Sequence, residues 1–232
     1  MNKISQKQGE LFMSNKIIGM CGLKGQGKNS VGSIIKNHFN NWELVSFATT
    51  LKDAIASMFG WNRDWLEGIT EESRAWREQP DEYWSKKFGR EVSPRTIMQE
   101  FGTNLVREKW LASFWIDSLE KNIMNSDKNI IITDVRYPNE MEMVKRLGGD
   151  LWLVHVGNLP YYWNAVCEYN KTGKIPEEEL VTLDEILEIH RSERDWIMPV
   201  ENFDVFINPA VKGLDELEKI VINAYENTKW LE

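Results

Sequence analysis

Short apolar runs alternate along the chain with longer stretches in which apolar side chains recur every three or four positions. The short runs are typical of buried β-strands, and the longer pattern is typical of amphipathic helices. Strands that alternate with helices favour a largely parallel sheet with helices on both faces, whose ligands bind at the carboxyl ends of the strands. The pattern therefore predicts an α/β fold with five strands, at residues 16–21, 42–47, 129–134, 151–156 and 203–208.

Helices are predicted between and after these strands, at residues 31–39, 49–60, 94–110, 115–123, 139–147 and 214–225. We expect Thr49 or Thr50 to cap the second of them, because a hydroxyl oxygen accepts the unpaired N–H groups of a first helical turn. Two long segments, 63–94 and 157–199, lack this periodicity and are rich in charged and aromatic residues. Both are expected to be irregular, and insertions of this length in an α/β unit are more often functional than idle.

Size and composition place the chain among globular proteins. Its 232 residues suffice for one domain with a substantial core, expected at residues 16–232 after a loose extension at residues 1–15. A net charge of −8 argues against a nucleic-acid polymer as the main ligand. Cys21 and Cys167 are too few for a disulfide framework or a metal site, so we expect a reducing cytoplasm. No apolar run is long enough to span a membrane.

A glycine-rich segment, Gly-Leu-Lys-Gly-Gln-Gly-Lys-Asn-Ser at residues 22–30, joins the first predicted strand to the first predicted helix. Its glycines allow successive N–H groups to turn inward on an anion, and the helix N-terminus adds further N–H groups and a positive dipole end. Lys28 adds a full charge for the outer phosphates. Asn29 stands where the strict pattern has Ser or Thr, and Ser30 follows one place later. A phosphate loop is favoured over the alternative, a glycine-rich turn with a solvated lysine.

Asp134 and Arg136 follow a predicted strand, which places them at the same sheet edge as the glycine-rich segment. A carboxylate at this edge can hold Mg²⁺ or its water shell beside nucleotide phosphates. A guanidinium group can grip a phosphate with two N–H groups. The alternatives are a helix N-cap for Asp134 and a surface salt bridge for Arg136.

Arg191 and Arg194 lie one helical turn apart in the late irregular segment. On a mobile lid, they could neutralise the charge that builds on a transferred phosphoryl group. A solvated helix face is the alternative, because four acidic residues lie close enough in sequence to pair with them. These are Glu185, Glu188, Glu193 and Asp195.

The order of these motifs resembles the deoxynucleoside monophosphate kinases of tailed bacteriophages, within the wider P-loop nucleoside monophosphate kinase fold. The resemblance extends from about Lys16 to the C-terminus and includes the glycine-rich segment. Further matching motifs are Phe-Ala-Thr-Thr-Leu-Lys-Asp-Ala at 47–54, Leu-Glu-Gly at 66–68, Ile-Met-Gln-Glu-Phe-Gly-Thr-Asn at 97–104, Thr-Asp-Val-Arg-Tyr-Pro-Asn-Glu at 133–140, His-x-Ser-Glu at 190–193 and Phe-Asp-x-x-Ile-Asn at 203–208.

The resemblance implies transfer of the γ-phosphoryl group of ATP, with Mg²⁺, to a deoxynucleoside 5′-monophosphate. It implies a three-layer fold with a helical monophosphate-binding insertion at about 60–110 and a lid at about 157–199. It assigns the ATP phosphates to Gly22, Gly25, Gln26, Gly27, Lys28, Asn29 and Ser30. It assigns the monophosphate to Lys24, Lys52, Asp53, Arg74, Gln99, Gly102, Thr103, Trp115, Asp134, Arg136 and Glu140.

The residues that would act in the transfer itself are Lys28, Asp134, Arg136, Arg191 and Arg194. Ser30 and Asp134 would hold Mg²⁺, in part through water. The resemblance further implies nucleotide partners, no membrane and action in the cytoplasm of a phage's host, with a homodimer left open.

Two alternative functions stay open. Asp134 could serve as the general base that an alcohol acceptor requires, which would make the chain a P-loop kinase of a small hydroxyl metabolite. A non-catalytic nucleotide-binding scaffold or regulatory module is the alternative from another class. A GTPase is disfavoured, because the base-reading Asn-Lys-x-Asp signature is missing.

Overall fold

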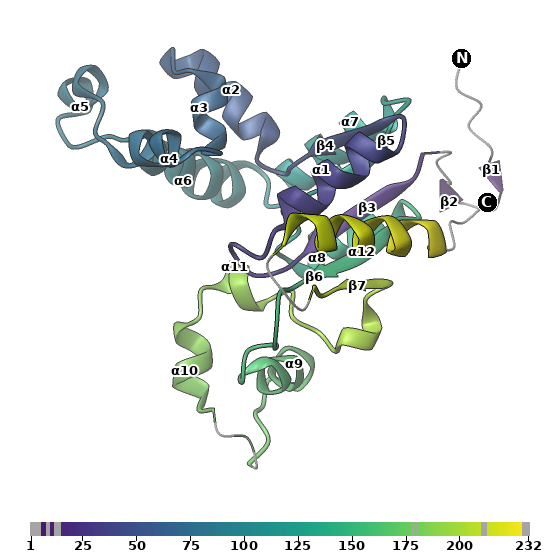
Figure 1. Cartoon of the computed structure of the whole chain (residues 1–232). Helices are drawn as coiled ribbons and strands as arrows, with labels where there is room; N and C mark the ends of the chain where they lie inside the picture. The colour runs from purple at the N-terminus through teal and green to yellow at the C-terminus, as the bar shows by residue number, and fades with distance from the viewer. Residues whose placement is uncertain are drawn as a thin grey trace. The chain divides into compact units, whose positions relative to one another are not determined.

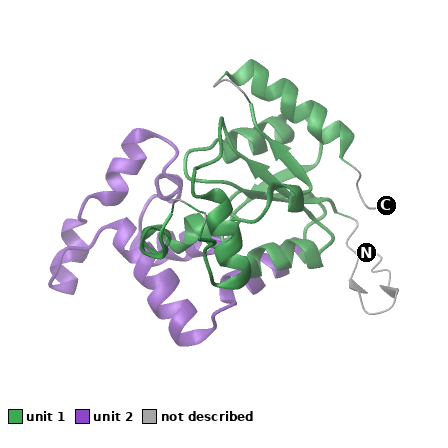
Figure 2. Ribbon diagram, turned by 90° about the horizontal axis from the view of Figure 1, so that it is seen from below, with its two compact units in different colours: residues 1–46, 124–232 green, residues 47–123 purple. Residues whose placement is uncertain are grey.

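The computed structural model describes residues 6–7, 10–11, 15–177, 179, 181–209 and 213–228. The chain forms two compact units, which Figure 2 shows in green and purple. Unit 1 comprises residues 1–46 and 124–232, and unit 2 comprises residues 47–123. The extension expected at residues 1–15 lies largely outside the described residues. Its described part contains the antiparallel two-residue strands β1 (Gln6–Lys7) and β2 (Glu10–Leu11).

The main sheet of unit 1 is parallel throughout, with the strand order β4-β5-β3-β6-β7 (Figure 1). All of the predicted strands are confirmed. Because the strands are parallel, the segments that follow β3, β5 and β6 leave the sheet at the same edge. The strands are β3 (Ile17–Cys21), β4 (Trp42–Val45), β5 (Asn129–Ile132), β6 (Asp150–Val154) and β7 (Val205–Ile207).

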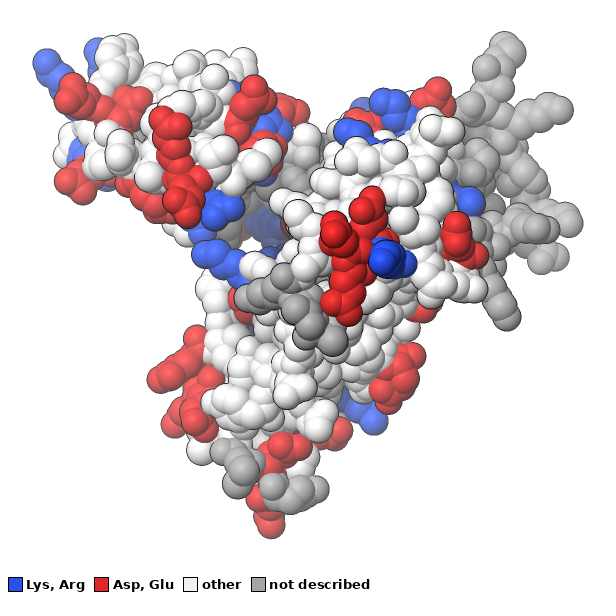
Figure 3. Space-filling view, in the orientation of Figure 1, with Lys and Arg blue, Asp and Glu red and all other residues white. Residues whose placement is uncertain are grey.

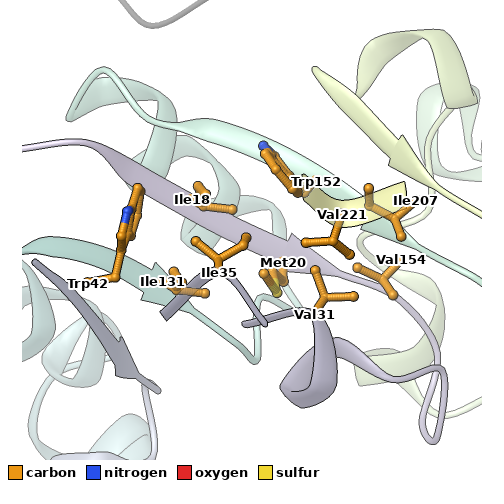
Figure 4. Close-up of a cluster of buried hydrophobic side chains, with 10 residues drawn as sticks. All are labelled: Ile18, Met20, Val31, Ile35, Trp42, Ile131, Trp152, Val154, Ile207 and Val221. Atoms are coloured by element: carbon orange, nitrogen blue, oxygen red, sulfur yellow. The ribbon is translucent and has the colours of Figure 1, made fainter. Parts of the chain in front are cut away.

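The central strand β3 is buried on both faces, which explains its uninterrupted apolar sequence. Ile18 and Met20 belong to a core cluster with residues of α1 (Lys28–His38) and α12 (Leu214–Asn227), shown in Figure 4. Gly19 faces the opposite side, where a Cβ atom would come within 2.8 Å of Val144 in α8 (Pro138–Arg146). The expected three-layer arrangement, with helices on both faces of the sheet, is therefore confirmed.

The segment 157–199 of unit 1 is more helical than the sequence predicted. It contains α9 (Trp163–Thr172), α10 (Leu183–Glu188) and α11 (Arg191–Arg194), followed by the 3₁₀-helix η2 (Val200–Asn202). The expectation of an irregular segment was wrong because α10 and α11 are too short for a clear apolar period. Single side chains define their starts: Thr182 forms a capping box with Glu185 at α10, and His190 accepts the Ser192 N–H group at α11.

Unit 2 consists of helices, as the predicted helical insertion requires. They are α2 (Thr49–Phe59), α3 (Arg63–Glu67), α4 (Glu71–Glu78), α5 (Glu82–Phe88), α6 (Pro94–Gln99), the π-helix η1 (Glu100–Trp110) and α7 (Phe114–Met124). Their core contains Ile55, Leu66 and Ile97, and aromatic rings extend it, with Phe59 stacked on Trp61 at a centroid distance of 4.6 Å. Several of the chain's tryptophans thus serve packing.

Two expectations for unit 2 need correction. Residues 63–94 form the short helices α3, α4 and α5 instead of an irregular segment, because Asn62, Thr70 and Asp81 each cap a helix start with a side-chain oxygen. The predicted cap by Thr49 or Thr50 was also wrong. The N-cap residue of α2 is Ala48, which provides no side-chain hydrogen bond, so both threonines already lie within the first turn.

The surface carries more acidic than basic side chains, in keeping with the net charge of −8. On the face shown in Figure 3, Asp and Glu side chains are spread widely, and Lys and Arg side chains form no broad basic area. Among the described residues, no helix combines the length and the apolar character that crossing a bilayer requires.

Candidate functional site

The glycine-rich segment after β3 turns tightly and leads directly into α1. Gly27 is the N-cap residue with φ +88°, in the left-handed region that favours glycine. Gly22 passes so close to β6 that a Cβ atom would lie 2.4 Å from the Val154 carbonyl oxygen. The Gln26 side chain also fixes the loop to β6, because its Oε1 accepts the Val156 N–H group at 2.7 Å. The N–H groups of the first turn of α1 thus open toward this loop.

Lys28, the first residue of α1, folds back over the loop. Its Nζ donates hydrogen bonds to the carbonyl oxygens of Gly22 at 2.6 Å and Leu23 at 2.9 Å, and the residue is only 8% exposed. Burial, and next the positive charge of Arg136, lower the pKa of Lys28 to about 8. The predicted alternative of a solvated lysine is therefore wrong. A buried cation at a helix N-terminus is suited to bind an anion.

Arg136 reaches the same loop from the segment between β5 and α8. Its Nη1 donates to the Gly22 carbonyl oxygen at 2.9 Å, so this nitrogen and Lys28 Nζ converge on one oxygen atom. Nη1 also forms an ion pair with Glu193 at 3.1 Å. The backbone of Arg136 is fixed too, because its N–H group donates to Glu140 Oε2 at 2.7 Å. Glu140 is 2% exposed, and its carboxylate here holds the turn that presents Arg136.

Asp134 lies just after β5 and is half-buried. Because β5 is the parallel neighbour of β3, Asp134 leaves the sheet at the same edge as the phosphate loop. Its negative charge raises the pKa of Lys28, opposing the larger effect of burial. The N-cap alternative for Asp134 is wrong, because the N-cap residue of α8 is Tyr137. The structure thus brings Lys28, Asp134 and Arg136 together at the carboxyl edge of the sheet.

The two arginines of α11 have other partners in this structure. Arg191 forms an ion pair with Asp195 at 2.8 Å, and Arg194 Nε lies 3.3 Å from the same carboxylate. Arg194 is buried, and its Nη1 donates to the Ile186 carbonyl oxygen at 2.6 Å. The residue of α11 that does contact the phosphate loop is Glu193, whose Oε2 accepts the Lys24 N–H group at 2.9 Å. Sequence reasoning missed this contact: it counted Glu193 in the motif at 190–193 and as a possible partner of the neighbouring arginines.

The expected site residues of unit 2 fall into small networks within that unit. Lys52 and Arg63 both pair with Glu67, at 2.6 Å for Lys52, and Arg63 also pairs with Asp53. These four side chains form one network of alternating opposite charges, and Lys52 and Asp53 both belong to it. Sequence reasoning did not assign a role to Arg63 or Glu67.

Two further arginines lie against the turn that follows α3 in unit 2, at Gly68 and Ile69. Arg74 donates to the carbonyl oxygens of Gly68 and Ile69, each at 2.9 Å. The guanidinium group of Arg77, which was not predicted, lies against Gly68 at the place where a Cβ atom would come within 2.2 Å of it. Burial, and then the charges of Arg95 and Arg74, lower the pKa of Arg77. Two guanidinium groups therefore lie beside this turn, next to the carboxylate of Glu67 in α3.

The remaining expected residues lie at the junction of α6 and η1 and in α7. Gln99 ends α6, and Gly102 and Thr103 lie in the π-helix η1. Trp115 Nε1 donates to the Gly102 carbonyl oxygen at 2.9 Å, while a Cβ atom on Gly102 would come within 2.8 Å of Leu51. Gly102 thus allows α2, η1 and α7 to approach closely. π-Helices are rare and occur frequently at functional sites.

Comparison with known proteins identifies the family. A family model described as deoxynucleotide monophosphate kinase matches residues 67–160. A protein of Acanthamoeba polyphaga mimivirus, named as a deoxynucleotide monophosphate kinase, is 32% identical over 149 residues, which cover 58% of this chain and 71% of that protein. The chain belongs to the deoxynucleotide monophosphate kinase family.

A second relative agrees with this membership. The deoxynucleoside-5′-monophosphate kinase of Escherichia phage T5 is 39% identical over 69 residues, which cover 28% of each chain. Solved structures are more distant. A dephospho-CoA kinase from Campylobacter jejuni has 12% identity and a TM-score of 0.44, covering 93% of this chain and 98% of that chain. A shikimate kinase from Bacteroides thetaiotaomicron has 15% identity and a TM-score of 0.42, covering 91% and 97%. Both TM-scores are too low to support the family assignment.

Among the residues that the structure describes, the donor groups of this deoxynucleotide monophosphate kinase family member do not form a metal site on their own. No cluster of three or more His, Cys, Asp or Glu side chains that could hold a metal occurs in the described part of the chain. Mg²⁺ usually takes only one or two carboxylates from a protein and completes its shell with water and substrate phosphate oxygens. One carboxylate, Asp134, near a phosphate loop fits an ion that enters with a nucleotide.

Proposed function

We propose that the protein transfers the γ-phosphoryl group of ATP to a deoxynucleoside 5′-monophosphate, giving the diphosphate and ADP. The observation that carries the proposal is the convergence of Lys28 Nζ and Arg136 Nη1 on the Gly22 carbonyl oxygen, at 2.6 and 2.9 Å. Two cations from different segments meet there at the head of a glycine-rich loop. Membership of the deoxynucleotide monophosphate kinase family supports the choice of acceptor.

The proposed chemistry needs charge stabilisation and no general base. A monophosphate acceptor already presents an anionic oxygen, so the protein has to position two phosphates and neutralise the charge that develops between them. On ATP binding, Lys28 would exchange the carbonyl oxygens of Gly22 and Leu23 for phosphate oxygens. The loop N–H groups, including those of Asn29 and Ser30, would hold the remaining oxygens.

We assign the monophosphate to the residues implied by the family resemblance. In unit 1 the assignment concerns Arg136, and in unit 2 it concerns Arg74, Gln99 and Thr103. Arg191 and Arg194 would approach the transferred group only after giving up the shared partner Asp195.

Asp134 and Ser30 would hold Mg²⁺ beside the ATP phosphates, in part through water. When bound, the ion would offset phosphate charge and fix the orientation of the β- and γ-phosphates. The protein would act in the cytoplasm of a phage's host.

The alternative of a small hydroxyl metabolite as acceptor would need a general base. Asp134 follows β5 at the sheet edge where the phosphate loop leads into Lys28. A carboxylate of this kind could accept a hydroxyl proton, but family membership favours the phosphate acceptor. Family membership equally favours a kinase over a non-catalytic scaffold.

A substrate panel tests the proposal. The full chain is incubated with ATP, Mg²⁺ and each of the common deoxynucleoside and ribonucleoside monophosphates, and ADP release is followed in a coupled assay. Gluconate, shikimate and dephospho-coenzyme A serve as alcohol acceptors in the same panel. We expect release that depends on a deoxynucleoside monophosphate. Release only with an alcohol acceptor, or none with any acceptor, would contradict the proposal.

ATP binding is expected to weaken above about pH 8. The pKa of Lys28 is lowered to about 8 in the nucleotide-free protein, and nearby phosphate charge would raise it. Binding above this pH therefore requires proton uptake, and the dissociation constant should rise by up to about tenfold per pH unit between about pH 8 and pH 10. Calorimetric titration in two buffers with different ionisation enthalpies measures the dissociation constant of ATP and the number of protons taken up on binding. Lys28→Arg, which keeps its charge throughout, should remove the dependence; a flat profile in the unmodified protein would contradict the prediction.

A further inference from the structure

A carboxylate lies among the phosphate-loop cations of unit 1. Glu193 Oε2 accepts the backbone N–H group of Lys24 at 2.9 Å, and Oε1 forms an ion pair with Arg136 Nη1 at 3.1 Å. The negative charge of Glu193 also acts on Lys28, whose pKa it raises against the larger effect of burial. One carboxylate thus meets a loop N–H group, a guanidinium group and a nearby ammonium group. These are the groups with which proteins bind phosphate.

We infer that the Lys24 N–H group and the Arg136 guanidinium group form an anion site that Glu193 fills in the nucleotide-free protein, and that a phosphate oxygen of the substrate displaces it. The inference rests on the proposed function only in naming the displacing anion as a nucleotide phosphate. Glu193 thus competes with the substrate phosphate for this anion site.

Displacement follows from the geometry of the donors. A single N–H group makes one well-aligned hydrogen bond, so the Lys24 N–H group cannot serve Glu193 and a phosphate oxygen together. Two anions at one guanidinium nitrogen would also repel each other. A phosphate that enters this place therefore removes Glu193 from both of its partners.

Displacement would also release α11. Glu193 is one of two links between α11 and Arg136, the other being a weaker hydrogen bond from Nη1 to the Ser192 carbonyl oxygen at 3.4 Å. Once Glu193 leaves, Arg191 and Arg194 lie on a helix no longer tied to the loop by a carboxylate. Phosphate binding and movement of α11 are thereby coupled.

A positioning role for Glu193 makes the opposite prediction. If Glu193 only held Arg136 in place, its loss would let the guanidinium group drift and would weaken phosphate binding. If Glu193 competes with phosphate, its loss strengthens binding. The sign of the change in affinity separates the two roles.

Binding of inorganic triphosphate to the full chain tests the inference. We expect Glu193→Gln to lower the dissociation constant for inorganic triphosphate by about five- to tenfold in calorimetric titration near pH 7. Glu188→Gln is the matched control, because it removes one exposed carboxylate from neighbouring α10 and should change the affinity little. Glu193→Ala provides a second variant and should show a similar gain. Unchanged or weaker binding in both Glu193 variants would overturn the inference.

The outcome is separable from that of the substrate panel, because inorganic triphosphate contains neither a base nor an acceptor. A gain in affinity without turnover on any deoxynucleotide would support the anion site and contradict the proposed function. Turnover on deoxynucleotides without a gain would overturn the anion site alone.

Discussion

Replacing Lys28 with methionine is expected to lower the rate of ADP formation by at least about a hundredfold, because a fixed positive charge is lost where phosphate charge develops. The fold should survive the change. Methionine fills a similar volume, and the charge that it replaces is costly to bury. A fall in pKa from 10.5 to about 8 corresponds to about 3 kcal/mol. Steady-state kinetics near pH 7 measure the rate of ADP formation, and urea denaturation at the same pH measures the free energy of unfolding.

The control for this prediction is Lys36→Met, on the exposed side of the same helix. It should leave turnover unchanged, since Lys36 has no place in the proposed site. A Lys28→Met protein that keeps near-normal turnover would contradict the role of the loop. A variant that loses activity only because it unfolds would be recognised from its denaturation curve.

The strands could be predicted from the sequence because a parallel sheet covered on both faces needs apolar residues at successive positions. β3 and β5 both show this, and each leads into a segment with charged residues. The glycine-rich segment was recognisable for the same reason, since it lies between a strand and a helix. The convergence of Lys28 and Arg136 followed from placing both at the carboxyl edge of one sheet.

Short helices were harder to predict. α3, α4 and α5 are too brief for a clear apolar period, and each start depends on a single capping side chain. Asn62, Thr70 and Asp81 are visible in the sequence, but such residues also occur in turns and irregular loops. The packing of these segments into the core, in which Leu66 is fully buried, stabilises them as helices, and the sequence does not show that packing.

The contact of Glu193 was beyond sequence reasoning for a different reason. Its partner Lys24 lies 169 positions earlier, whereas arginines lie directly beside it in the sequence. Local spacing therefore favoured an ion pair within α11. The fold instead directs this carboxylate to the phosphate loop and leaves Asp195 to pair with the arginines.

Replacing Arg136 with alanine is expected to weaken binding of the deoxynucleoside monophosphate by about 10- to 100-fold, and binding of ATP by far less. Among the described residues, the side-chain contacts of Arg136 are all made by Nη1. The Nε and Nη2 groups are then available for a two-point grip on the acceptor phosphate. ATP keeps Lys28 and the loop N–H groups. Its loss of an Arg136 contact is partly offset, because Glu193, which Arg136 holds beside the Lys24 N–H group, then competes less for that group.

Calorimetric titration of each nucleotide separately measures this asymmetry. Arg146→Ala is the control, because Arg146 is exposed at the end of α8, the helix that follows Arg136. Arg136→Lys should rescue little of the affinity, since an ammonium group cannot hold the loop carbonyl oxygen and two phosphate oxygens in one plane. Equal losses for ATP and the monophosphate would contradict the assignment of Arg136 to the acceptor phosphate, because the guanidinium group would then serve both nucleotides alike.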